Sequence, residues 1–238
     1  MMITGYTFII KKRVIKMDIK LFFEALIKIF LGIIIVGLLI FLPGTLEFWQ
    51  GWLFICILFI PMFIAGIVMI IKNPNLLRRR LNNKEKEGEQ KVVILLSSLM
   101  FIVGFIIAGL NYRFDWFVLP DIITWIGAFL FLVSYILYAE VLRENEYLLR
   151  TVEVEKDQKL VDTGLYGIVR HPMYSTTLIL FLSMPLILGS LISFIIFLVY
   201  PFIIIKRIKN EEEVLEKDLK GYKEYKKKVK YRLIPFIY

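Results

Sequence analysis

The side chains best suited to chemistry surround His171, the only histidine of the 238-residue chain. Arg170 precedes it, Pro172 follows it, and Tyr166 and Tyr174 lie within five residues of it. An imidazole can accept or donate a proton near neutral pH, so His171 is a candidate base or ligand contact. It also fits a purely structural position, because proline suits the first turn of a helix and disfavours helical geometry in the residue before it. Spacing alone leaves both interpretations open.

A second polar group, Arg207 with the acidic run Glu211–Glu213, follows a long apolar stretch. Arg207 and Glu211 are four residues apart and therefore share a helix face. They can bind a ligand, or they can form a surface ion pair that contributes under about 1 kcal/mol. If the apolar stretch is a helical hairpin, its exit returns to the side of its start, and Arg207 can then approach His171.

The composition indicates a membrane protein. Apolar residues make up 58% of the chain and aromatic residues 15%. This apolar share is well above that of a typical soluble domain. The net charge of +9 comes from Lys and Arg in short blocks between apolar runs, a layout that encodes membrane orientation. We therefore expect the lipid bilayer, and no nucleic acid, as a partner. The single cysteine, Cys56, lies within an apolar run and cannot form an intrachain disulfide.

Six apolar segments are expected. They cover residues 19–42, 49–71, 92–110, 121–139, 173–186 and 191–205. The last two come from one run of 33 uncharged residues. As a single helix, such a run measures roughly 50 Å against a bilayer core of about 30 Å. Pro185 and Gly189-Ser190 interrupt this run, so we expect two short helices joined by a tight turn.

The basic residues predict which connections face the cytoplasm. The amino-terminal residues 1–18, the charged connection 72–91, the polar stretch 140–170 and the tail 206–238 hold nearly all Lys and Arg. The remaining connections contain only Arg113. This pattern predicts cytoplasmic termini, with the first apolar segment retained as a span and Met17 as a second possible start.

The carboxyl-terminal tail carries an amphipathic pattern. Apolar residues recur at helical spacing against a lysine-rich face: Leu215, Leu219, Tyr222, Tyr225 and Val229. Such a helix can lie on the membrane surface or pack on the aqueous face of the site. The fold class is therefore all-α: a polytopic integral membrane helical bundle whose last two apolar segments form a short hairpin, plus a carboxyl-terminal amphipathic helix. No repeat or linker divides residues 1–238, so we expect a single membrane domain.

Other site classes lack their sequence patterns. No glycine-rich phosphate loop of the P-loop or dinucleotide type is present. No His or Cys cluster suits a metal, so none is expected. His171 has no close acidic partner in the sequence, as a serine hydrolase would need, and Asp162 is only a remote candidate. Transport through a midplane site would require ionisable groups within the spans, which are scarce beyond Glu24 and Lys28.

The ordered polar motifs resemble a known family. The carboxyl-terminal half resembles the isoprenylcysteine carboxyl methyltransferases and the related phospholipid methyltransferases. Five motifs, in this order, carry the resemblance: Gly164-Leu165-Tyr166, Arg170-His171-Pro172-Met173-Tyr174, Arg207 with Glu211-Glu212-Glu213, Gly221-Tyr222-Lys223-Glu224-Tyr225 and Arg232-Leu233-Ile234-Pro235. Gly44-Thr45-Leu46, Asn73-Pro74 and Arg113-Phe114-Asp115-Trp116 also resemble prokaryotic members. Four of the predicted transmembrane segments lie in residues 1–140, and the resemblance implies a cofactor-binding catalytic half in residues 141–238.

The resemblance further implies an enzyme that binds S-adenosyl-L-methionine at the cytosolic face and methylates a lipophilic or lipidated substrate. The implied cofactor contacts are Gln158, Lys159, Leu160, Val161, Tyr166, His171, Pro172, Met173, Tyr174 and Glu211. Arg207 would face the substrate, and Arg207 and His171 are the candidates for direct participation in the reaction. The chain departs from the family pattern at Leu165, Gly167 and Thr176, which replace a common Pro, Arg and Gly.

Two rival functions stay open. Membrane sterol reductases resemble this family in their carboxyl-terminal half, so an NADPH-dependent reductase is one alternative. A non-catalytic membrane binding protein of the same fold is the other. The substrate's reactive group, carboxylate, amine or thiol, is not defined by the sequence.

Overall fold

The computed structural model describes residues 19–81, 88–145, 147, 154 and 158–238. Its helical elements in chain order are α1 (Ile19–Phe41), α2 (Trp49–Lys72), α3 (Pro74–Leu81), α4 (Gly88–Phe114), α5 (Asp121–Glu144), the 3-10 turn η1 (Gly164–Gly167), α6 (Pro172–Ile187), α7 (Leu191–Phe197), α8 (Tyr200–Asp218) and α9 (Tyr222–Lys228). The amino-terminal basic cluster and Met17 lie outside the described residues.

The predicted all-α membrane bundle is confirmed. Five segments of the described chain are long and apolar enough to cross a membrane: α1, α2, most of α4, α5 and the α7–α8 segment. The shorter apolar helix α6 makes six apolar segments within that part of the chain. Large apolar side chains point outward along these helices, as at Phe30, Phe129 and Ile136, which are 61%, 67% and 71% exposed. An apolar exterior of this extent is stable only against lipid.

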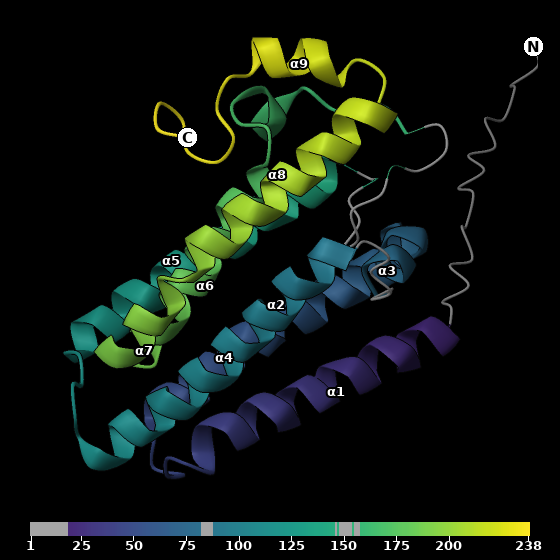
Figure 1. The fold of residues 1–238 in the computed structure, drawn as a ribbon. Helices are drawn as coiled ribbons and strands as arrows, with labels where there is room; N and C mark the ends of the chain where they lie inside the picture. The colour runs from purple at the N-terminus through teal and green to yellow at the C-terminus, as the bar shows by residue number, and fades with distance from the viewer. Residues whose placement is uncertain (1–18, 82–87, 146, 148–153, 155–157) are drawn as a thin grey trace, which may run out of the picture.

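The connections sort to two ends of the bundle. Figure 1 shows the links α1–α2, α4–α5 and α6–α7 at its lower left, and α3 and α9 towards the opposite end. The α4–α5 link is hydrogen-bonded to the α6–α7 turn, since Leu119 N donates to the Gly189 carbonyl over 2.8 Å and Leu191 N to the Phe117 carbonyl over 3.2 Å. The three connections that contain few basic residues therefore lie at the same end of the bundle.

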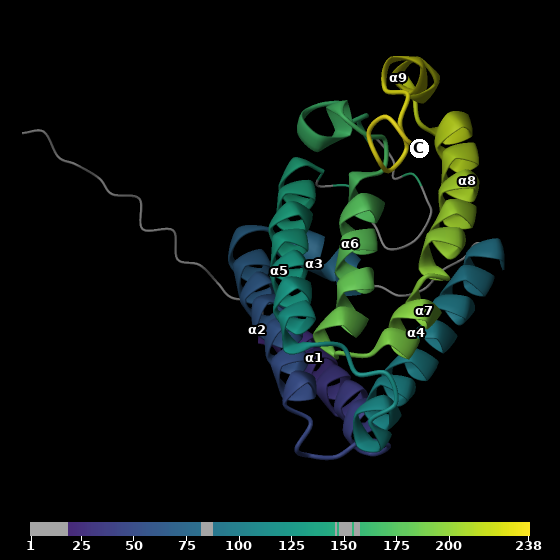
Figure 2. The same cartoon turned by 90° about the vertical axis from the view of Figure 1, so that its left-hand side faces the viewer.

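The predicted hairpin forms, and its turn is at Gly189. Pro185 lies inside α6. Gly189 adopts a left-handed φ of +62°, which glycine tolerates without steric cost. The Ser190 side chain then caps α7 by accepting a hydrogen bond from Ser193 N over 3.2 Å. Figure 2 shows α6 between α5 and α8, with α9 and the carboxyl-terminal end above the start of α6.

The second arm of the hairpin differs from the sequence prediction. It breaks once, between Phe197 and Tyr200, and then continues as α8 well beyond Ile205 to Asp218. Pro201 sits in the first turn of α8, where its missing N–H costs no helical hydrogen bond. Lys and Glu are good helix formers, so the helix persists after its apolar part ends. Arg207 and Glu211 thus lie on one rigid helix.

The amphipathic tail is divided between two helices. Gly221, at a φ of +87°, separates α8 from α9. Leu219, Tyr222, Tyr225 and Val229 nevertheless form one buried cluster, against which Leu160 packs. Of the two placements considered for this pattern, the helices pack onto the polar segment near residue 160.

Part of the charged connection 72–91 is also helical. In α3, Pro74 occupies the first turn, and the Asn73 side chain accepts a hydrogen bond from Leu76 N over 3.1 Å. Leu77 packs in a buried cluster with Leu21 of α1. The buried Leu76 and Leu77 therefore anchor this basic helix to the bundle.

The packing of α1 against α4 yields a stability prediction. A Cβ on Gly109 would overlap the carbonyl oxygen of Ile40, whereas a Cβ on Gly66 meets nothing within 4 Å. Gly109→Ala is expected to destabilise the protein by about 1–3 kcal/mol, because the helices must separate. Gly66→Ala is the matched control and should be neutral or slightly stabilising. Thermal unfolding in detergent measures both, and equal melting temperatures would contradict this packing.

Candidate functional site

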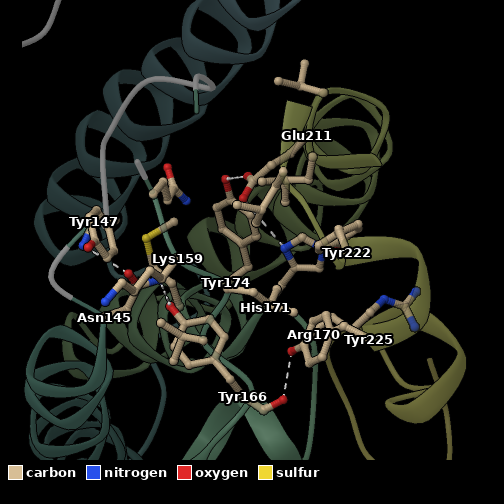
Figure 3. A pocket seen from close by; sticks show the side chains of 17 residues that line it. Asn145, Tyr147, Lys159, Tyr166, Arg170, His171, Tyr174, Glu211, Tyr222 and Tyr225 are labelled. Carbon is tan, nitrogen blue, oxygen red and sulfur yellow. Dashed lines mark hydrogen bonds and ion pairs between the residues drawn. The ribbon is translucent and has the colours of Figure 1, made fainter. Parts of the chain in front are cut away.

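A pocket lies at the end of the bundle that carries α9. Its empty volume, including the open space at its mouth, is about 810 Å³. Figure 3 shows its wall, which is built from the end of α5, the segment near residue 160, η1, the start of α6, the polar end of α8 and α9. Segments far apart in the sequence therefore contribute to one cavity.

Most residues predicted as cofactor contacts line this pocket. They are Gln158, Lys159, Leu160, Val161, Tyr166, His171, Met173, Tyr174 and Glu211. Pro172 is buried in the first turn of α6, and neither it nor Arg207 lines the pocket. The pocket also contains residues outside the predicted contact set: Asn145, Tyr147, Arg170, Val214, Leu215, Leu219, Tyr222 and Tyr225. The role of the predicted residues as cofactor contacts stays a prediction.

Tyr174 separates the pocket from Arg207. Its hydroxyl accepts a hydrogen bond from Arg207 Nε over 2.8 Å and donates one to the Glu211 carboxylate. The Arg207 guanidinium lies 5.8 Å from the centre of the Tyr174 ring. Arg207 and Glu211, four residues apart on α8, therefore meet at the same hydroxyl rather than acting independently.

Two carboxylates hold His171 in the wall. Its Nε2 lies 3.2 Å from Glu212 Oε1, and its Nδ1 lies 3.7 Å from Glu211 Oε1. The ring also stacks on Tyr174 with centres 5.8 Å apart. At 5% exposure, His171 is a fixed part of the pocket wall.

Glu212 is the centre of this end of the molecule. Its side chain is 3% exposed and accepts hydrogen bonds from Arg170 Nε at 2.8 Å and Arg232 Nε at 3.0 Å, in addition to its contact with His171. Lys226 Nζ lies 3.6 Å away. These partners come from the start of α6, from α9 and from the carboxyl-terminal segment, so one carboxylate joins three parts of the chain to α8.

The charges around Glu212 keep it ionised. The charged part of α8 begins at Lys206, beyond its apolar part, so Glu212 lies outside the apolar layer. Burial by itself raises the pKa of Glu212, but hydrogen bonds from His171, Arg232 and Arg170 outweigh that effect and hold the pKa well below its ordinary value. Sequence spacing contained a signal for this residue, since Ile204, Ile208 and Glu212 recur every four positions on the buried face of α8.

Tyr166 is fixed by hydrogen bonds at both ends. Asn145 Nδ2 donates to its hydroxyl over 3.0 Å, and the Tyr225 hydroxyl donates to its backbone carbonyl over 2.7 Å. Burial raises the pKa of the Tyr166 phenol, and the hydrogen bond from Asn145 offsets this only in part. The phenol therefore stays protonated at neutral pH.

The departure from the family pattern at Leu165 has a structural role. Its backbone N–H donates to Glu144 Oε2 over 3.0 Å, a bond that a proline at this position cannot make. The preceding Gly164 has a φ of +52°, and a Cβ there would overlap the Glu144 carboxylate. The end of α5 therefore holds η1, and with it Tyr166.

The other two departures are also accommodated locally. Thr176 is buried, and its hydroxyl donates to the Met173 carbonyl over 2.7 Å within α6. Gly167 ends η1, where a Cβ would come within 3.3 Å of the Asp162 carbonyl. Neither position interrupts the pocket wall.

Tyr222 presents an unused polar atom at the pocket. Its side chain is 3% exposed, and its hydroxyl has no hydrogen-bond partner within the described ranges of the chain. A buried hydroxyl without a partner costs free energy, which a ligand group can recover. Burial raises the pKa of Tyr222, so this hydroxyl is available as a donor at neutral pH.

The arrangement combines aromatic rings, one accessible carboxylate and polar donors around a single cavity. Such a lining suits a ligand that is partly aromatic and carries positive charge or hydrogen-bonding hydroxyls. Among the described side chains, no group of three or more His, Cys, Asp or Glu residues can hold a metal ion.

Comparison with known proteins supports the family resemblance. Residues 122–221 match the sequence model of the phospholipid methyltransferase family, which confirms the resemblance predicted from the sequence. The matched segment runs from α5 through η1, α6 and α7 to α8, and so carries Tyr166, His171, Tyr174 and Glu211. The chain is also 33% identical over 93 residues to the Delta(14)-sterol reductase of Mus musculus, an alignment that covers 38% of this chain and 22% of the reductase. The chain thus spans only about a fifth of the length of that relative.

The Glu212 cluster yields a prediction of stability and its pH dependence. Glu212→Gln leaves the buried Arg170 and the partly buried Arg232 without their counter-charge, and should cost about 3–5 kcal/mol. Because the folded-state pKa of Glu212 is depressed, its contribution is fully present above the ordinary value of 4.5 and is lost as the pH falls below it. Thermal unfolding between about pH 7 and pH 3 should show a steeper acid loss for the wild type than for Glu212→Gln.

Glu213→Gln is the matched control for that experiment. Glu213 is the next residue on α8 and is exposed. Its substitution should change the melting temperature little at any pH. Equal effects of the two substitutions would contradict the central role of Glu212.

Proposed function

We propose that this protein is an S-adenosyl-L-methionine-dependent membrane methyltransferase that methylates a lipophilic substrate at the cytosolic face. One observation carries the proposal: a single pocket is lined by Tyr166, His171, Tyr174 and Glu211. All four lie in the segment that matches the phospholipid methyltransferase family. These residues come from separate elements, yet they surround one cavity.

The pocket has groups that suit the proposed cofactor. S-adenosyl-L-methionine, when bound, supplies a methyl group on a positively charged sulfur. Glu211 can accept hydrogen bonds from an amino group or a ribose, and Lys159 can pair with a carboxylate. The rings of Tyr166 and Tyr174 can stack on adenine or face a cation. The unpartnered hydroxyl of Tyr222, as counted over the described residues, offers one further donor.

The chain's own contribution to catalysis would be mainly alignment. Methyl transfer from a sulfonium is an in-line displacement, so holding the nucleophile and the methyl group in line can supply much of the rate. Tyr174 is bonded to Glu211 on the pocket side and to Arg207 on the other. We place the cofactor on the Glu211 side and the substrate on the Arg207 side of this ring.

The roles of Arg207 and His171 follow from that division. Arg207 can hold a carboxylate substrate bidentately, and such a substrate needs no base. An amine or thiol substrate must first lose a proton. Because both nitrogens of His171 already face carboxylates, we assign His171 to positioning Glu211 and closing the pocket, and Arg207 to the substrate.

The membrane orientation is part of the same proposal. The pocket lies at the end of the bundle opposite the connections that are poor in basic residues. The positive-inside rule then assigns the pocket and both termini to the cytoplasmic side. A lipidated or otherwise lipophilic substrate, such as an isoprenylcysteine-like or phospholipid molecule, would reach it from the bilayer.

The similarity to the Delta(14)-sterol reductase favours one rival function, an NADPH-dependent membrane reductase. The alignment covers only 22% of that relative, whereas the phospholipid methyltransferase match is to a family model and runs through the segment from α5 to α8 that carries most of the pocket wall. A non-catalytic binding protein with the same pocket is the second rival.

Cofactor binding tests the proposal directly. Isothermal titration of the purified protein in detergent with S-adenosyl-L-methionine should show binding. His171→Ala removes part of the pocket wall, and Glu211→Gln removes a charge-assisted hydrogen bond. Each substitution should weaken the affinity roughly 10-fold or more. Glu213→Gln, which alters the exposed neighbouring carboxylate, should bind as the wild type does. No binding, or binding unaffected by either pocket variant, would overturn the proposal.

Two further measurements separate the rivals. A melting temperature that rises with NADPH and ignores S-adenosyl-L-methionine would favour the reductase. Cofactor binding without a methylated product, in mass spectrometry of membranes incubated with methyl-labelled cofactor, would favour the non-catalytic protein.

A further inference from the structure

The loop that follows α9 carries an exposed apolar tip, residues 234–237. Phe236 and Ile237 are 86% and 77% exposed, and Ile234 is 39% exposed. On either side of the tip, Leu233 is buried and Tyr238 packs against the main apolar core. The chain therefore leaves the protein interior only at the tip. Adjacent exposed side chains of this size are typical of a contact with lipid or with another protein.

Backbone hydrogen bonds close the loop around this tip. The Tyr238 backbone oxygen accepts hydrogen bonds from the N–H groups of Arg232, Leu233 and Ile234 over 2.9, 2.7 and 3.0 Å. The Tyr238 N–H in turn donates to the Ile234 carbonyl over 3.0 Å. Phe236 has a left-handed φ of +67°, which is unfavourable for a bulky side chain. Such a conformation persists only where its surroundings fix it, so the closed loop holds Phe236 in its exposed position.

The loop is also bound to the start of α6. His171 N donates to the Arg232 carbonyl over 2.9 Å, and the Ser175 hydroxyl donates to the Leu233 carbonyl over 2.6 Å. Ser175 lies near the beginning of α6, which is an apolar helix. The loop therefore lies at the level where the apolar part of the bundle begins, and it is attached to the wall of the pocket.

The position of the loop on the bundle favours the bilayer as the partner of the tip. Figure 1 shows the carboxyl-terminal end on the side of α6 and α8 that faces away from α1 and α2, and Figure 2 shows it next to the start of α6. Lys227 and Lys230, shortly before the tip, are exposed. Apolar side chains accompanied by exposed lysines are typical of a segment that lies in the head-group boundary of a membrane.

We propose that the tip inserts Phe236 and Ile237 into the bilayer leaflet on the pocket side of the bundle, at the boundary between head groups and acyl chains. The partner is the lipid surface itself. Insertion removes the apolar surface of both side chains from water. Because the loop is hydrogen-bonded to the His171 backbone, this contact also holds one wall of the pocket in place. The contact exists whatever ligand the pocket binds.

Spin labels at the tip test this contact. Cys56, the only cysteine of the chain, is first removed as Cys56→Ala. Phe236→Cys, Ile237→Cys and the control Lys223→Cys are then labelled singly with a nitroxide in lipid nanodiscs of phosphatidylcholine and phosphatidylglycerol. Collision rates are measured with oxygen, which concentrates in lipid, and with a water-soluble nickel chelate. Oxygen should dominate at positions 236 and 237, and nickel at position 223, which is exposed on α9.

Two results would overturn the proposal. Nickel access at positions 236 and 237 equal to that at position 223 would mean that the tip faces water. Access by neither reagent would mean that protein covers the tip, either a second copy of this chain or another partner. Because both side chains are exposed, each labelled variant should fold, and the two positions report independently.

Hydrogen exchange in nanodiscs tests the effect on the pocket wall. The double variant Phe236→Asn/Ile237→Ser removes both apolar side chains, and asparagine tolerates the left-handed conformation. The amides of residues 231–238 and of His171 should exchange faster in this variant than in the wild type. Lys223→Gln is the matched control and should leave them unchanged. Since the protein covers little of either side chain, faster exchange indicates the loss of a contact outside the protein. Unchanged exchange in the double variant would contradict the support of the pocket wall by lipid.

Discussion

The polar end of the molecule depends on one buried carboxylate. Glu212 can stay ionised at 3% exposure only because Arg170, Arg232 and His171 surround it. That requirement ties the start of α6 and the carboxyl-terminal segment to α8. Since Glu211 is the next residue on the same helix, fixing Glu212 also fixes the direction in which Glu211 points. The charge cluster therefore sets the geometry of the pocket, although Glu212 itself does not line it.

The Tyr174 hydroxyl couples the two sides of the site. The hydroxyl donates a hydrogen bond to Glu211 and accepts one from Arg207. A ligand group that competes for Glu211 therefore also changes the hydrogen bonding of Arg207. A purely structural tyrosine would need only one partner to satisfy its buried hydroxyl. The second partner makes this residue a physical link between the proposed cofactor and substrate sides.

The sequence predicted well those features that depend on local patterns. Long uncharged runs identify the apolar segments, and the excess length of residues 173–205 with Gly189 in its middle identifies the hairpin. The four-residue spacing of Ile204, Ile208 and Glu212 marks Glu212 as the carboxylate on the buried face of α8. Its partners could not be predicted, because Arg170 and Arg232 lie 42 and 20 residues from it along the chain. That pairing depends on tertiary packing between segments distant in the chain.

The matched family segment and the rest of the chain contribute different parts of the site. Residues 122–221, which match the phospholipid methyltransferase family, carry most of the pocket wall. Tyr225 and Arg232 come from outside that segment. Tyr225 donates a hydrogen bond to the Tyr166 carbonyl, and Arg232 completes the charge balance of Glu212. The pocket wall in the matched segment therefore depends on the carboxyl-terminal residues for its geometry.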